Sequence, residues 1–438
     1  MASSTPPTWA DLAGRRVGLW GVGVEGLAML QRLTALAAEV LLVDDKPSGP
    51  VGDHEVTLIA EGGLALLQGC EFVLKSPGVS RYRPEIQSLV AAGIPVLGGM
   101  GLTLAELDAS NIAAITGTKG KSTTTHLVGH LLSRLGRDVL LGGNLGETPY
   151  DPIRNEASEF VVLELSSFQI TDLATAPRIV AITSLGVDHV DWHGSPERYQ
   201  ADKLSLASLP GVETVLISAE DHGLRTALEA MGVTASLVDA DDRGLAGRLG
   251  LTGQHNQANA ALALAIVECL IGSPIASEAL ADLAEEFHPL PGRFTEIALH
   301  DGVRFIDDSL ATNVLPSIAA LSALETERVA MLIGGFDRGI DYQALAAAIA
   351  ARSRDSLVLC LPDNGPAIGG LISAFKNPLV SVELYDSIEA AVPEAFAWAQ
   401  AEGGVVLLSP AAPSFSQFSN WLHRSEVFGQ AVQSLIAE

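Results

Sequence analysis

A short segment rich in glycine and lysine has the composition of a loop that binds a triphosphate. Gly117-Thr118-Lys119-Gly120-Lys121-Ser122-Thr123 lies between a run typical of a strand, 112–116, and a run typical of a helix. Glycines let backbone N–H groups face a phosphate chain, and the helix N-terminus adds positive potential. Lys121 could reach the outer phosphates, and Ser122 could bind Mg²⁺. Ile115 replaces the first glycine of the strict pattern. A helix-capping turn is the alternative, but we predict a nucleoside triphosphate site.

A second glycine-rich turn lies near the N-terminus. Gly21-Val22-Gly23-Val24-Glu25-Gly26 follows the apolar run 16–20, and the acidic pair Asp44-Asp45 ends the next such run. The acid stands about 20 residues after the turn, a spacing typical of dinucleotide-binding proteins. NAD or another nucleoside diphosphate would fit this pattern, and so would a turn without a ligand.

Carboxylates and imidazoles follow two apolar runs of the middle region. Glu164 comes directly after 160–163, where a carboxylate in the sheet of the phosphate loop is well placed to bind Mg²⁺. Asp188-His189-Val190-Asp191-Trp192-His193 follows the run 179–185. This cluster indicates a second metal position or substrate contacts, although a histidine after a buried strand can also be structural.

Three later segments are weaker candidates. Residues 253–259 (GQHNQAN) begin an alanine-rich helix, and we expect their amides to cap it rather than to recognise a base. The loops 334–339 (GGFDRG) and 409–415 (SPAAPSF) each follow an apolar run. Both could present hydrogen-bond donors to an anion at the edge of a sheet, or could be simple turns.

Strand-like runs alternate with alanine- and leucine-rich helical patterns, which predicts an α/β chain with mainly parallel sheets. A glycine-rich stretch at 97–101 and the sequence HPLPG at 288–292 suggest two breaks. We therefore expect domains at 1–97, 98–291 and 292–438. The predicted strands are 16–20, 40–44, 72–75, 95–97, 112–116, 139–141, 160–163, 179–185, 214–218, 303–306, 329–333, 356–361, 380–384 and 405–408.

Composition restricts the partners and the compartment. The 438 residues include 26 basic and 52 acidic ones, a net charge of −26, which argues against nucleic acid and anionic membranes as partners. Cys70, Cys269 and Cys360 are too dispersed for a disulfide framework or a zinc site. The apolar run 260–267 stops at Glu268, well below the ~20 residues of a membrane span. Because the start also lacks a signal-peptide pattern, we expect a cytoplasmic protein.

Together and in this order, the motifs resemble the Mur ligases, ATP-dependent amide-forming enzymes of peptidoglycan precursor synthesis. The resemblance covers nearly the whole chain and is carried by TGTKGKSTT (116–124), GNLG (143–146), ELSSFQ (164–169), DHVDWH (188–193), Lys203, HNQAN (255–259), GRF (292–294) and DDSLATN (307–313). It implies a Rossmann-like N-terminal domain for UDP, a central P-loop ATPase-like domain for ATP and Mg²⁺, and a Rossmann-like C-terminal domain for glutamate. The NAD interpretation then falls away.

The resemblance also implies roles for individual residues. Lys121, His189 and Lys203 would be catalytic, and Lys203 matches a lysine that is carbamylated in the family. The implied ATP-binding residues are Gly117, Thr118, Lys119, Gly120, Lys121, Ser122, Thr123, Asn259, Arg293 and Asp308, and the implied metal ligands are Ser122, Glu164, His189 and Lys203. The UDP substrate would be bound by Gly21, Gly23, Gly26, Asp44, Ser76, Gly78, Asn144, Ser166 and Gln169. Glutamate would be bound by Leu310, Thr312, Arg338, Ser414, Phe415 and Trp421.

The implied reaction activates the carboxylate of UDP-N-acetylmuramoyl-L-alanine as an acyl phosphate, which the amine of glutamate then attacks. Domain closure would exclude water from the acyl phosphate. Leu310, Arg338 and Trp421 depart from the usual D-glutamate pattern, and WGVGVEG, DWHG, GGFDRG and SPAAPSF resemble a subgroup that adds L-glutamate. DSLATN, in contrast, keeps more of the D-glutamate form. Because more of these motifs resemble the L-glutamate subgroup, we favour L-glutamate over D-glutamate.

Other functions stay open from the sequence. The folylpolyglutamate and cyanophycin-type ligases are similar in the central and C-terminal regions. A non-catalytic nucleotide-dependent scaffold is a different class, although Lys121, Ser122, Glu164, His189 and Lys203 argue against it. An NAD oxidoreductase would leave the loop around Lys121 unused. We expect small-molecule substrates and a monomer.

Overall fold

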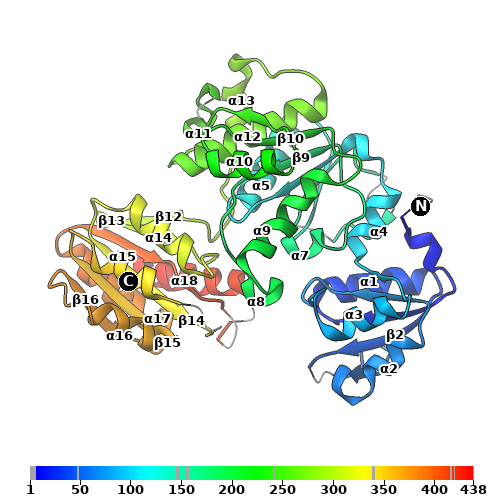
Figure 1. The fold of residues 1–438 in the computed structure, drawn as a ribbon. Coiled ribbons are helices and arrows are strands. Elements are labelled where there is room, and N and C mark those ends of the chain that lie inside the picture. Colours follow the sequence, from blue (N-terminus) through cyan, green and yellow to red (C-terminus); the bar gives the residue numbers. More distant parts are fainter. Residues whose placement is uncertain are drawn as a thin grey trace. The chain divides into compact units, whose positions relative to one another are not determined.

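The computed structural model describes residues 6–46, 49–144, 148–152, 157–240, 242–251, 253–337, 341–414, 417–418 and 420–437. Strands and helices alternate along the chain, as expected for the α/β class (Figure 1). Two compact units are present, residues 1–287 and residues 288–438. The first unit contains two separate sheets, and the second contains one.

The N-terminal sheet of the first unit has the order β3-β2-β1-β4-β5, and its strands are parallel. Helices α1 (Val24–Ala35), α2 (Gly63–Gln68) and α3 (Pro84–Ala91) connect them. Parallel pairing brings the turns after β1, β2 and β4 to one edge of the sheet. The strands are β1 (Arg16–Trp20), β2 (Glu39–Asp44), β3 (Val56–Leu58), β4 (Phe72–Lys75) and β5 (Val96–Leu97).

The second sheet has the order β11-β10-β9-β6-β8-β7 and is also parallel. Its strands are β6 (Ile112–Thr116), β7 (Val139–Gly143), β8 (Phe160–Glu164), β9 (Ile179–Ile182), β10 (Thr214–Ser218) and β11 (Ser236–Val238). Apolar cores cover both faces, one of them built around α5 (Lys121–Arg134) and α12 (Gln254–Ile271). The remaining helices are α4 (Gly99–Glu106), α7 (Ser167–Ile170), α8 (Val190–His193), α9 (Pro196–Ser205), α10 (His222–Ala230), α11 (Leu245–Arg248) and α13 (Leu280–Ala284).

The second unit has a sheet of order β12-β13-β17-β14-β15-β16, in which β12 is antiparallel to β13 and the other neighbours are parallel. The strands are β12 (Thr295–His300), β13 (Val303–Asp307), β14 (Val329–Gly335), β15 (Ser356–Asp363), β16 (Val380–Leu384) and β17 (Gly404–Leu408). The helices are α14 (Val314–Ala323), α15 (Gln343–Ala350), α16 (Gly365–Ser373), α17 (Ile388–Gln400) and α18 (Trp421–Ala437).

The predicted mainly parallel α/β architecture is confirmed, with three strands added to those predicted. β3, β11 and β12 were not expected from the sequence, and each lies at the edge of its sheet. Their side chains are largely half-buried or exposed, so their sequences lack a continuous apolar run. β9 ends at Ile182, three residues before the predicted end, because the chain turns there towards the phosphate loop.

The glycine-rich stretch at 97–101 lies between the two sheets of the first unit and is closely packed. A Cβ at Gly98 or Gly101 would lie less than 3 Å from Asp172, and one at Gly99 would lie 2.7 Å from Tyr150. The backbone therefore comes so close to its neighbours that side chains do not fit. The predicted boundary at 97/98 falls inside the first compact unit, and the predicted boundary at 291/292 lies near the division at 287/288.

None of the helices in the described ranges is long and apolar enough to cross a membrane.

Candidate functional site

The loop between β6 and α5 has the geometry of an anion-binding turn. Gly117 and Gly120 adopt positive φ, and Gly120 is the N-cap of α5. Lys121 Nζ donates to the carbonyl of Gly117 at 3.0 Å, which folds the ammonium group over the loop. Ser122 is buried in the first turn of the helix. The positive end of α5 and an ammonium group thus meet at one point, as a phosphate chain requires.

Residues outside the predicted set brace this loop. The Thr118 hydroxyl lies 3.0 Å from the hydroxyl of Tyr199 on α9. The same Thr118 hydroxyl accepts a hydrogen bond from the N–H of Gly186 at 2.8 Å. The N–H of Lys119 donates to Ser184 Oγ at 2.8 Å, and Thr183 also bonds to the Lys119 carbonyl. Sequence reasoning missed Tyr199, Thr183 and Ser184; residues 183–184 fell inside the predicted strand 179–185, whereas β9 ends at Ile182.

Glu164 ends β8 and is 1% exposed. The ladder pairs it with Ile115, next to the start of the phosphate loop. Its Oε1 accepts a hydrogen bond from Asn144 Nδ2 at 2.7 Å, whereas the buried Oε2 has no hydrogen-bond partner within the described residues. Burying an unpaired carboxylate oxygen is costly, and a divalent cation would remove that cost. Carboxylate and hydroxyl oxygens, as on Glu164 and Ser122, are the ligands Mg²⁺ prefers.

Lys203 lies on α9 and is 1% exposed. Its Nζ donates to the carbonyl of Gly117 at 3.1 Å, so it contacts the same loop as Lys121. Burial holds the pKa of Lys203 well below its ordinary value, and the positive charge of Lys121 acts in the same direction. The negative charges of Asp188 and Glu164 oppose this shift. Burial thus shifts this group in the direction of the neutral amine.

The two histidines of the segment 188–193 have different environments. His189 adopts a left-handed backbone conformation and leaves 43% of its side chain exposed. Burial lowers its pKa despite the charges of Asp188 and Asp191, and the charge of Lys121 lowers it further. His193 is fully buried and bonds to Asp202 and Ser167. His189 therefore fits a role in the site, whereas His193 is held by the protein itself.

No group of three or more His, Cys, Asp or Glu side chains in the described ranges is arranged to hold a metal ion. The predicted metal ligands other than Glu164 and His189 are a hydroxyl and a lysine amine. A cation held there would therefore need further oxygen ligands, such as phosphate or water, to complete a coordination shell.

Asn259 is buried on α12, where its Oδ1 accepts from Thr124 Oγ1 at 3.4 Å. Since Thr124 belongs to the first turn of α5, Asn259 lies beside the phosphate loop. Helix α12 begins at Gln254, as expected, but the expected amide cap is absent: Gly253 is the N-cap, and no side chain among the described residues caps the helix there. The other predicted ATP contacts, Arg293 and Asp308, belong to the second unit.

The turn after β1 is joined to the ends of β2 and β4. The N–H of Val22 donates to Asp44 Oδ2 at 2.8 Å, and Ser76 Oγ donates to the carbonyl of Gly21 at 2.7 Å. The structure thus brings Asp44 and Ser76 together at one sheet edge. Gly23 and Gly78 are exposed, and a Cβ added at either glycine would meet no heavy atom of the described residues within 4 Å.

Glu25 links this turn to the second sheet, a contact the sequence did not indicate. It accepts hydrogen bonds from Tyr150 Oη at 2.6 Å and from Gln169 Nε2 at 2.7 Å. Burial raises the pKa of Glu25, although both hydrogen bonds act in the opposite direction. Gln169 also forms a capping box with Ser166 at the start of α7. Ser166 and Gln169, like Asp44, Ser76 and Asn144, are therefore already engaged with protein atoms.

Gly26 is expected to be sensitive to substitution. A Cβ at this position would lie 1.9 Å from the carbonyl oxygen of Gly21, so the turn would have to move. We expect Gly26→Ala to lower the free energy of unfolding by about 1–3 kcal/mol, measured by urea unfolding. The matched control is Gly23→Ala, because a Cβ there meets no described atom within 4 Å. Equal stabilities of the two variants would contradict the prediction.

In the second unit, the predicted glutamate contacts lie around the ends of β13 and β17. The N–H of Leu310 donates to the carbonyl of Gly292 at 2.8 Å, and a Cβ at Gly292 would lie 3.2 Å from the Trp421 ring. Thr312 is half-buried and Ser414 is buried. Arg338 and Phe415 lie outside the described residues.

Arg424 on α18, which the sequence did not single out, joins these loops. It is fully buried, donating to the carbonyls of Ala412 at 2.9 Å and of Ser309 at 2.7 Å. Burial lowers its pKa to about 10, while Asp307 and Asp308 act against that shift. The Arg424 side chain thereby links the loops 307–313 and 409–414 through hydrogen bonds.

Because Asp308 is buried, we expect the stability of the folded chain to depend on pH. Burial raises its pKa to about 7, although the hydrogen bond from Ser409 and the charge of Arg293 lower it. The folded chain therefore binds this proton more tightly than the unfolded chain, whose aspartates titrate near pH ~4. The free energy of unfolding should therefore fall as pH rises from about 4 to about 7. The fall is at most about 1.4 kcal/mol for each unit by which the pKa of Asp308 differs between the folded and the unfolded chain.

The test is urea unfolding of the full chain at pH about 5 and about 8. Asp308→Asn cannot lose a proton, so the variant should show a smaller loss of stability between the two conditions than the unsubstituted chain. The same pH dependence in both proteins would show that Asp308 is not the group responsible.

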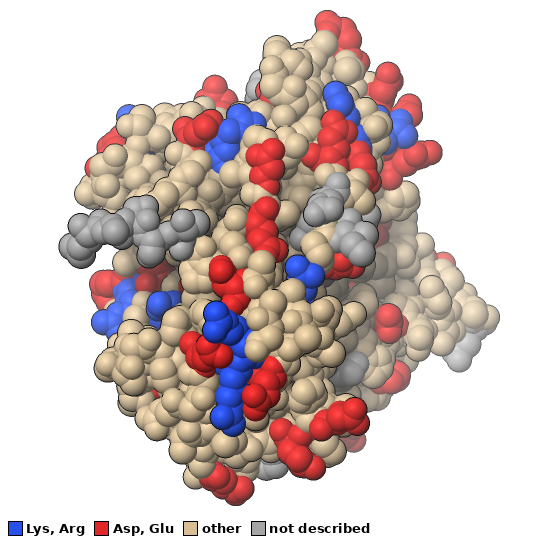
Figure 2. All heavy atoms as spheres, turned by 90° about the vertical axis from the view of Figure 1, so that its right-hand side faces the viewer, with Lys and Arg blue, Asp and Glu red and all other residues tan. Residues whose placement is uncertain are grey.

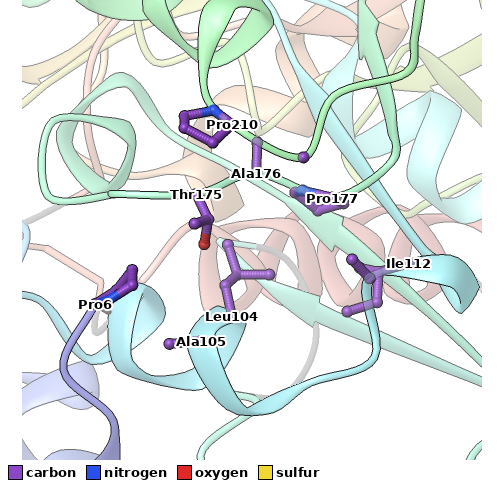
Figure 3. A pocket seen from close by; sticks show the side chains of 10 residues that line it. Pro6, Leu104, Ala105, Ile112, Thr175, Ala176, Pro177 and Pro210 are labelled. Atoms are coloured by element: carbon purple, nitrogen blue, oxygen red, sulfur yellow. The ribbon is translucent and has the colours of Figure 1, made fainter. Parts of the chain in front are cut away.

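A cavity of about 260 Å³ lies at the other edge of the second sheet. Its lining includes Leu104, Ile112, Ala176, Pro177 and Pro210, most of them apolar (Figure 3). Ile112 is the first residue of β6, whereas the phosphate loop follows the last residue of that strand. None of the described residues that line this cavity is titratable, so we do not assign the chemistry to it.

A parallel sheet that carries a phosphate loop at its carboxyl edge, with a buried acid beside it, is the architecture of a P-loop nucleotide-binding protein. The Mur ligase middle domain matches residues 115–244, and the Mur ligase glutamate ligase domain matches residues 292–412. The chain belongs to the Mur ligase family.

Two relatives match almost end to end. A UDP-N-acetylmuramoyl-L-alanine--L-glutamate ligase from Micromonospora sp. is 37% identical over 97% of this chain and 98% of its own. A protein of the same name from Salinispora tropica is 36% identical, with the same coverage.

Solved structures share the fold at lower identity. The UDP-N-acetylmuramate-alanine ligase of Thermotoga maritima has a TM-score of 0.55 and 18% identity, covering 96% of this chain and 100% of that chain. The folylpolyglutamate synthase of Mycobacterium tuberculosis has a TM-score of 0.56 and 16% identity, covering 75% of this chain and 92% of that chain.

Proposed function

We propose that this Mur ligase uses ATP to join L-glutamate to UDP-N-acetylmuramoyl-L-alanine through an amide bond, in peptidoglycan precursor synthesis. The observation that carries the proposal is the combination at the end of β6 and β8. Lys121 covers the phosphate loop there, and the buried Glu164 has one oxygen without a hydrogen-bond partner within the described residues. The near full-length match to relatives named for this activity supports the choice of substrates.

ATP would bind with its phosphates on residues 117–123, where the helix N-terminus and Lys121 face the negative charge. Asn259, beside the loop, would contact ATP from α12, and Arg293 and Asp308 would contribute from the second unit. Ser122, Glu164 and His189 would hold Mg²⁺. When bound, Mg²⁺ would neutralise charge on the phosphates during transfer.

The sugar nucleotide would bind at the turn formed by Gly21, Gly23, Gly26, Asp44, Ser76 and Gly78. Asn144, Ser166 and Gln169 would face its muramoyl-alanine part. Because the amide of Gln169 donates to Glu25, this residue would bind substrate through its remaining hydrogen-bonding capacity or after exchanging partners. Glutamate would bind to Leu310, Thr312, Arg338, Ser414, Phe415 and Trp421.

The reaction would proceed in two steps. A carboxylate oxygen of the substrate attacks the γ-phosphorus of ATP, and the bond to the β–γ bridging oxygen breaks to release ADP. Lys121 stabilises negative charge on the phosphoryl group during this transfer. The amine of glutamate then attacks the acyl carbon, loses a proton, and displaces inorganic phosphate. The product contains a new amide bond.

Lys203 would enter the site as a carbamate. The shift of its pKa towards the neutral amine supports this, because only the unprotonated nitrogen attacks CO₂. The modification replaces a buried cation with a carboxylate-like group beside the phosphate loop. That group would suit a metal ligand.

We also propose that the chain acts in the cytoplasm as a monomer without nucleic-acid partners. The net charge of −26 supports the last point. On the face shown in Figure 2, Lys and Arg side chains lie among acidic ones. Among the described ion pairs, Arg15 Nη1 lies 2.9 Å from Glu71 Oε2.

Release of phosphate by the full chain tests the substrate class. ATP, Mg²⁺ and glutamate are supplied with either UDP-N-acetylmuramoyl-L-alanine or a reduced folate. We expect phosphate release with the sugar nucleotide alone, since the N-terminal sheet provides a nucleotide turn. Release with the folate alone would favour a folylpolyglutamate-type ligase and overturn the proposal.

A further inference from the structure

A network of buried and partly buried hydrogen bonds adjoins the proposed site without taking part in its chemistry. Both ring nitrogens of the fully buried His193 are engaged: Nδ1 lies 2.6 Å from Asp202 Oδ2, and Nε2 lies 2.9 Å from Ser167 Oγ. The other carboxylate oxygen of Asp202 accepts from Tyr82 Oη at 2.6 Å. The network thus joins α7, α8 and α9 to the loop that follows β4.

Aromatic packing reinforces these bonds. The His193 ring lies with its centroid 4.5 Å from that of Trp192, 5.3 Å from that of Tyr199 and 5.6 Å from that of Phe168. Trp192 donates through Nε1 to the carbonyl of Pro77 at 3.0 Å and accepts at its own carbonyl from Ser80 Oγ at 2.8 Å. Helix α8 is therefore fastened to the loop after β4 by two hydrogen bonds of its own, in addition to the bond that Tyr82 makes to α9.

Helix α9 connects this network to the phosphate loop. Tyr199 and Lys203 are four residues apart and so share a helix face. Tyr199 contacts Thr118, and Lys203 contacts Gly117. Asp202, the residue before Lys203, engages His193 and Tyr82. A shift or rotation of α9 that broke the bonds of Asp202 would therefore also move Lys203 relative to the loop.

The cost of disturbing the network would be high. Its polar atoms are mutually satisfied in a largely buried, aromatic environment, in which Asp202 keeps 15% of its side chain exposed and an unpaired group is unfavourable. Such a network specifies one position for the helix. The Asp202 carboxylate and the His193 imidazole bond to each other, to Tyr82 and to Ser167 rather than to the phosphate loop, so a role in positioning fits better than a role in the chemistry.

We propose that Asp202 and His193 are positioning residues that hold Lys203 and the adjoining His189 turn in place for metal binding, and that Tyr82 makes the N-terminal region part of this support. The inference deepens the proposed function and depends on its metal site. It assigns a contribution to catalysis to a tyrosine located among the loops of the sugar-nucleotide region.

The mildest test removes one hydroxyl. Tyr82→Phe keeps the ring that packs on Trp192 but loses the bond to Asp202. We expect kcat to fall and the Mg²⁺ concentration for half-maximal rate to rise, each about threefold to tenfold, with the KM for glutamate unchanged. The matched control is Tyr385→Phe, which also removes a tyrosine–carboxylate hydrogen bond, to Glu383, but in the second unit. This control should behave as the unsubstituted chain does.

A binding measurement separates positioning from stability. Mn²⁺ binding to the full chain with ADP, followed by electron paramagnetic resonance, should weaken about tenfold or more in Asp202→Asn and to a smaller degree in Tyr82→Phe. Asp202→Glu should recover part of the affinity. The inference is overturned if both variants, Tyr82→Phe and Asp202→Asn, have a lower melting temperature but bind Mn²⁺ with the affinity of the unsubstituted chain.

The two failures are distinguishable. If the unsubstituted chain forms no product, the proposed function fails. If the unsubstituted chain is active and both variants bind Mn²⁺ and respond to Mg²⁺ as it does, the positioning role fails while the function stands.

Discussion

Replacing Lys121 by alanine is expected to lower kcat at least about 1,000-fold, equivalent to about 4 kcal/mol of transition-state stabilisation. The Lys121 ammonium lies over the phosphate loop, where its Nζ contacts the carbonyl of Gly117 at 3.0 Å. In the proposed mechanism this ammonium group reaches the γ-phosphate during transfer. Lys203 contacts the same carbonyl, but its side chain is buried on α9, and we do not expect it to take the place of the Lys121 ammonium over the loop.

The measurement separates chemistry from substrate binding. Formation of ADP and of the amide product is followed in one assay, and binding of the UDP substrate is followed by calorimetry. We expect the dissociation constant of the UDP substrate to change less than about threefold, because its proposed turn belongs to the N-terminal sheet. Lys376→Ala, at a site outside the proposed machinery, is the control. Turnover of Lys121→Ala at the rate of the control would refute the assignment of the phosphate loop.

Replacing Glu164 by glutamine is expected to separate activity from stability. The substitution keeps the size of the side chain but removes the charge of a carboxylate that is 1% exposed. Because Oε2 has no hydrogen-bond partner within the described residues, the protein without metal gains little from that charge. We expect kcat to fall about 100-fold or more and the free energy of unfolding of the metal-free chain to stay constant or to rise by about 1 kcal/mol.

Two measurements test this prediction. Activity is measured at increasing Mg²⁺ concentration, and the stability of the metal-free chain is measured by urea unfolding in the presence of a chelator. Glu159→Gln is the matched control, since Glu159 is exposed, pairs with Arg137 and lies at the opposite end of the same strand region. A fall in stability of several kcal/mol without a change in Mg²⁺ dependence would mean that the Glu164 carboxylate is structural. The metal assignment would then be wrong.

Much of the fold could be predicted because buried parallel strands have continuous apolar sequences. β1, β4, β6 and β10 were predicted with the bounds that the structure gives them. The edge strands β3, β11 and β12 were not, since half-exposed side chains leave no such run. The sequence does not show that the glycines at 98–101 pack closely against Asp172 and Tyr150.

The candidate site was predictable where a local motif contains it. The phosphate loop is continuous in sequence, and Gly120, Lys121 and Ser122 lie where the pattern requires, although Ile115 replaces its first glycine. Its supports are not continuous: Tyr199 reaches Thr118 across 81 residues, and Glu25 reaches Gln169 across 144. Such pairs leave no local pattern, so Tyr199, Glu25, Tyr150 and Arg424 required the structure. The likeness to a family supplied roles for residues in the second unit that spacing alone would not reveal.

Mass analysis of the product most directly tests the central claim. The purified chain is incubated with ATP, Mg²⁺ and UDP-N-acetylmuramoyl-L-alanine, and L-glutamate and D-glutamate are offered separately. We predict that one glutamyl residue is added, with one ADP formed per product, and that L-glutamate is the preferred donor. Product from D-glutamate alone would contradict the stereochemical assignment, and no glutamyl product from either enantiomer would contradict the account as a whole.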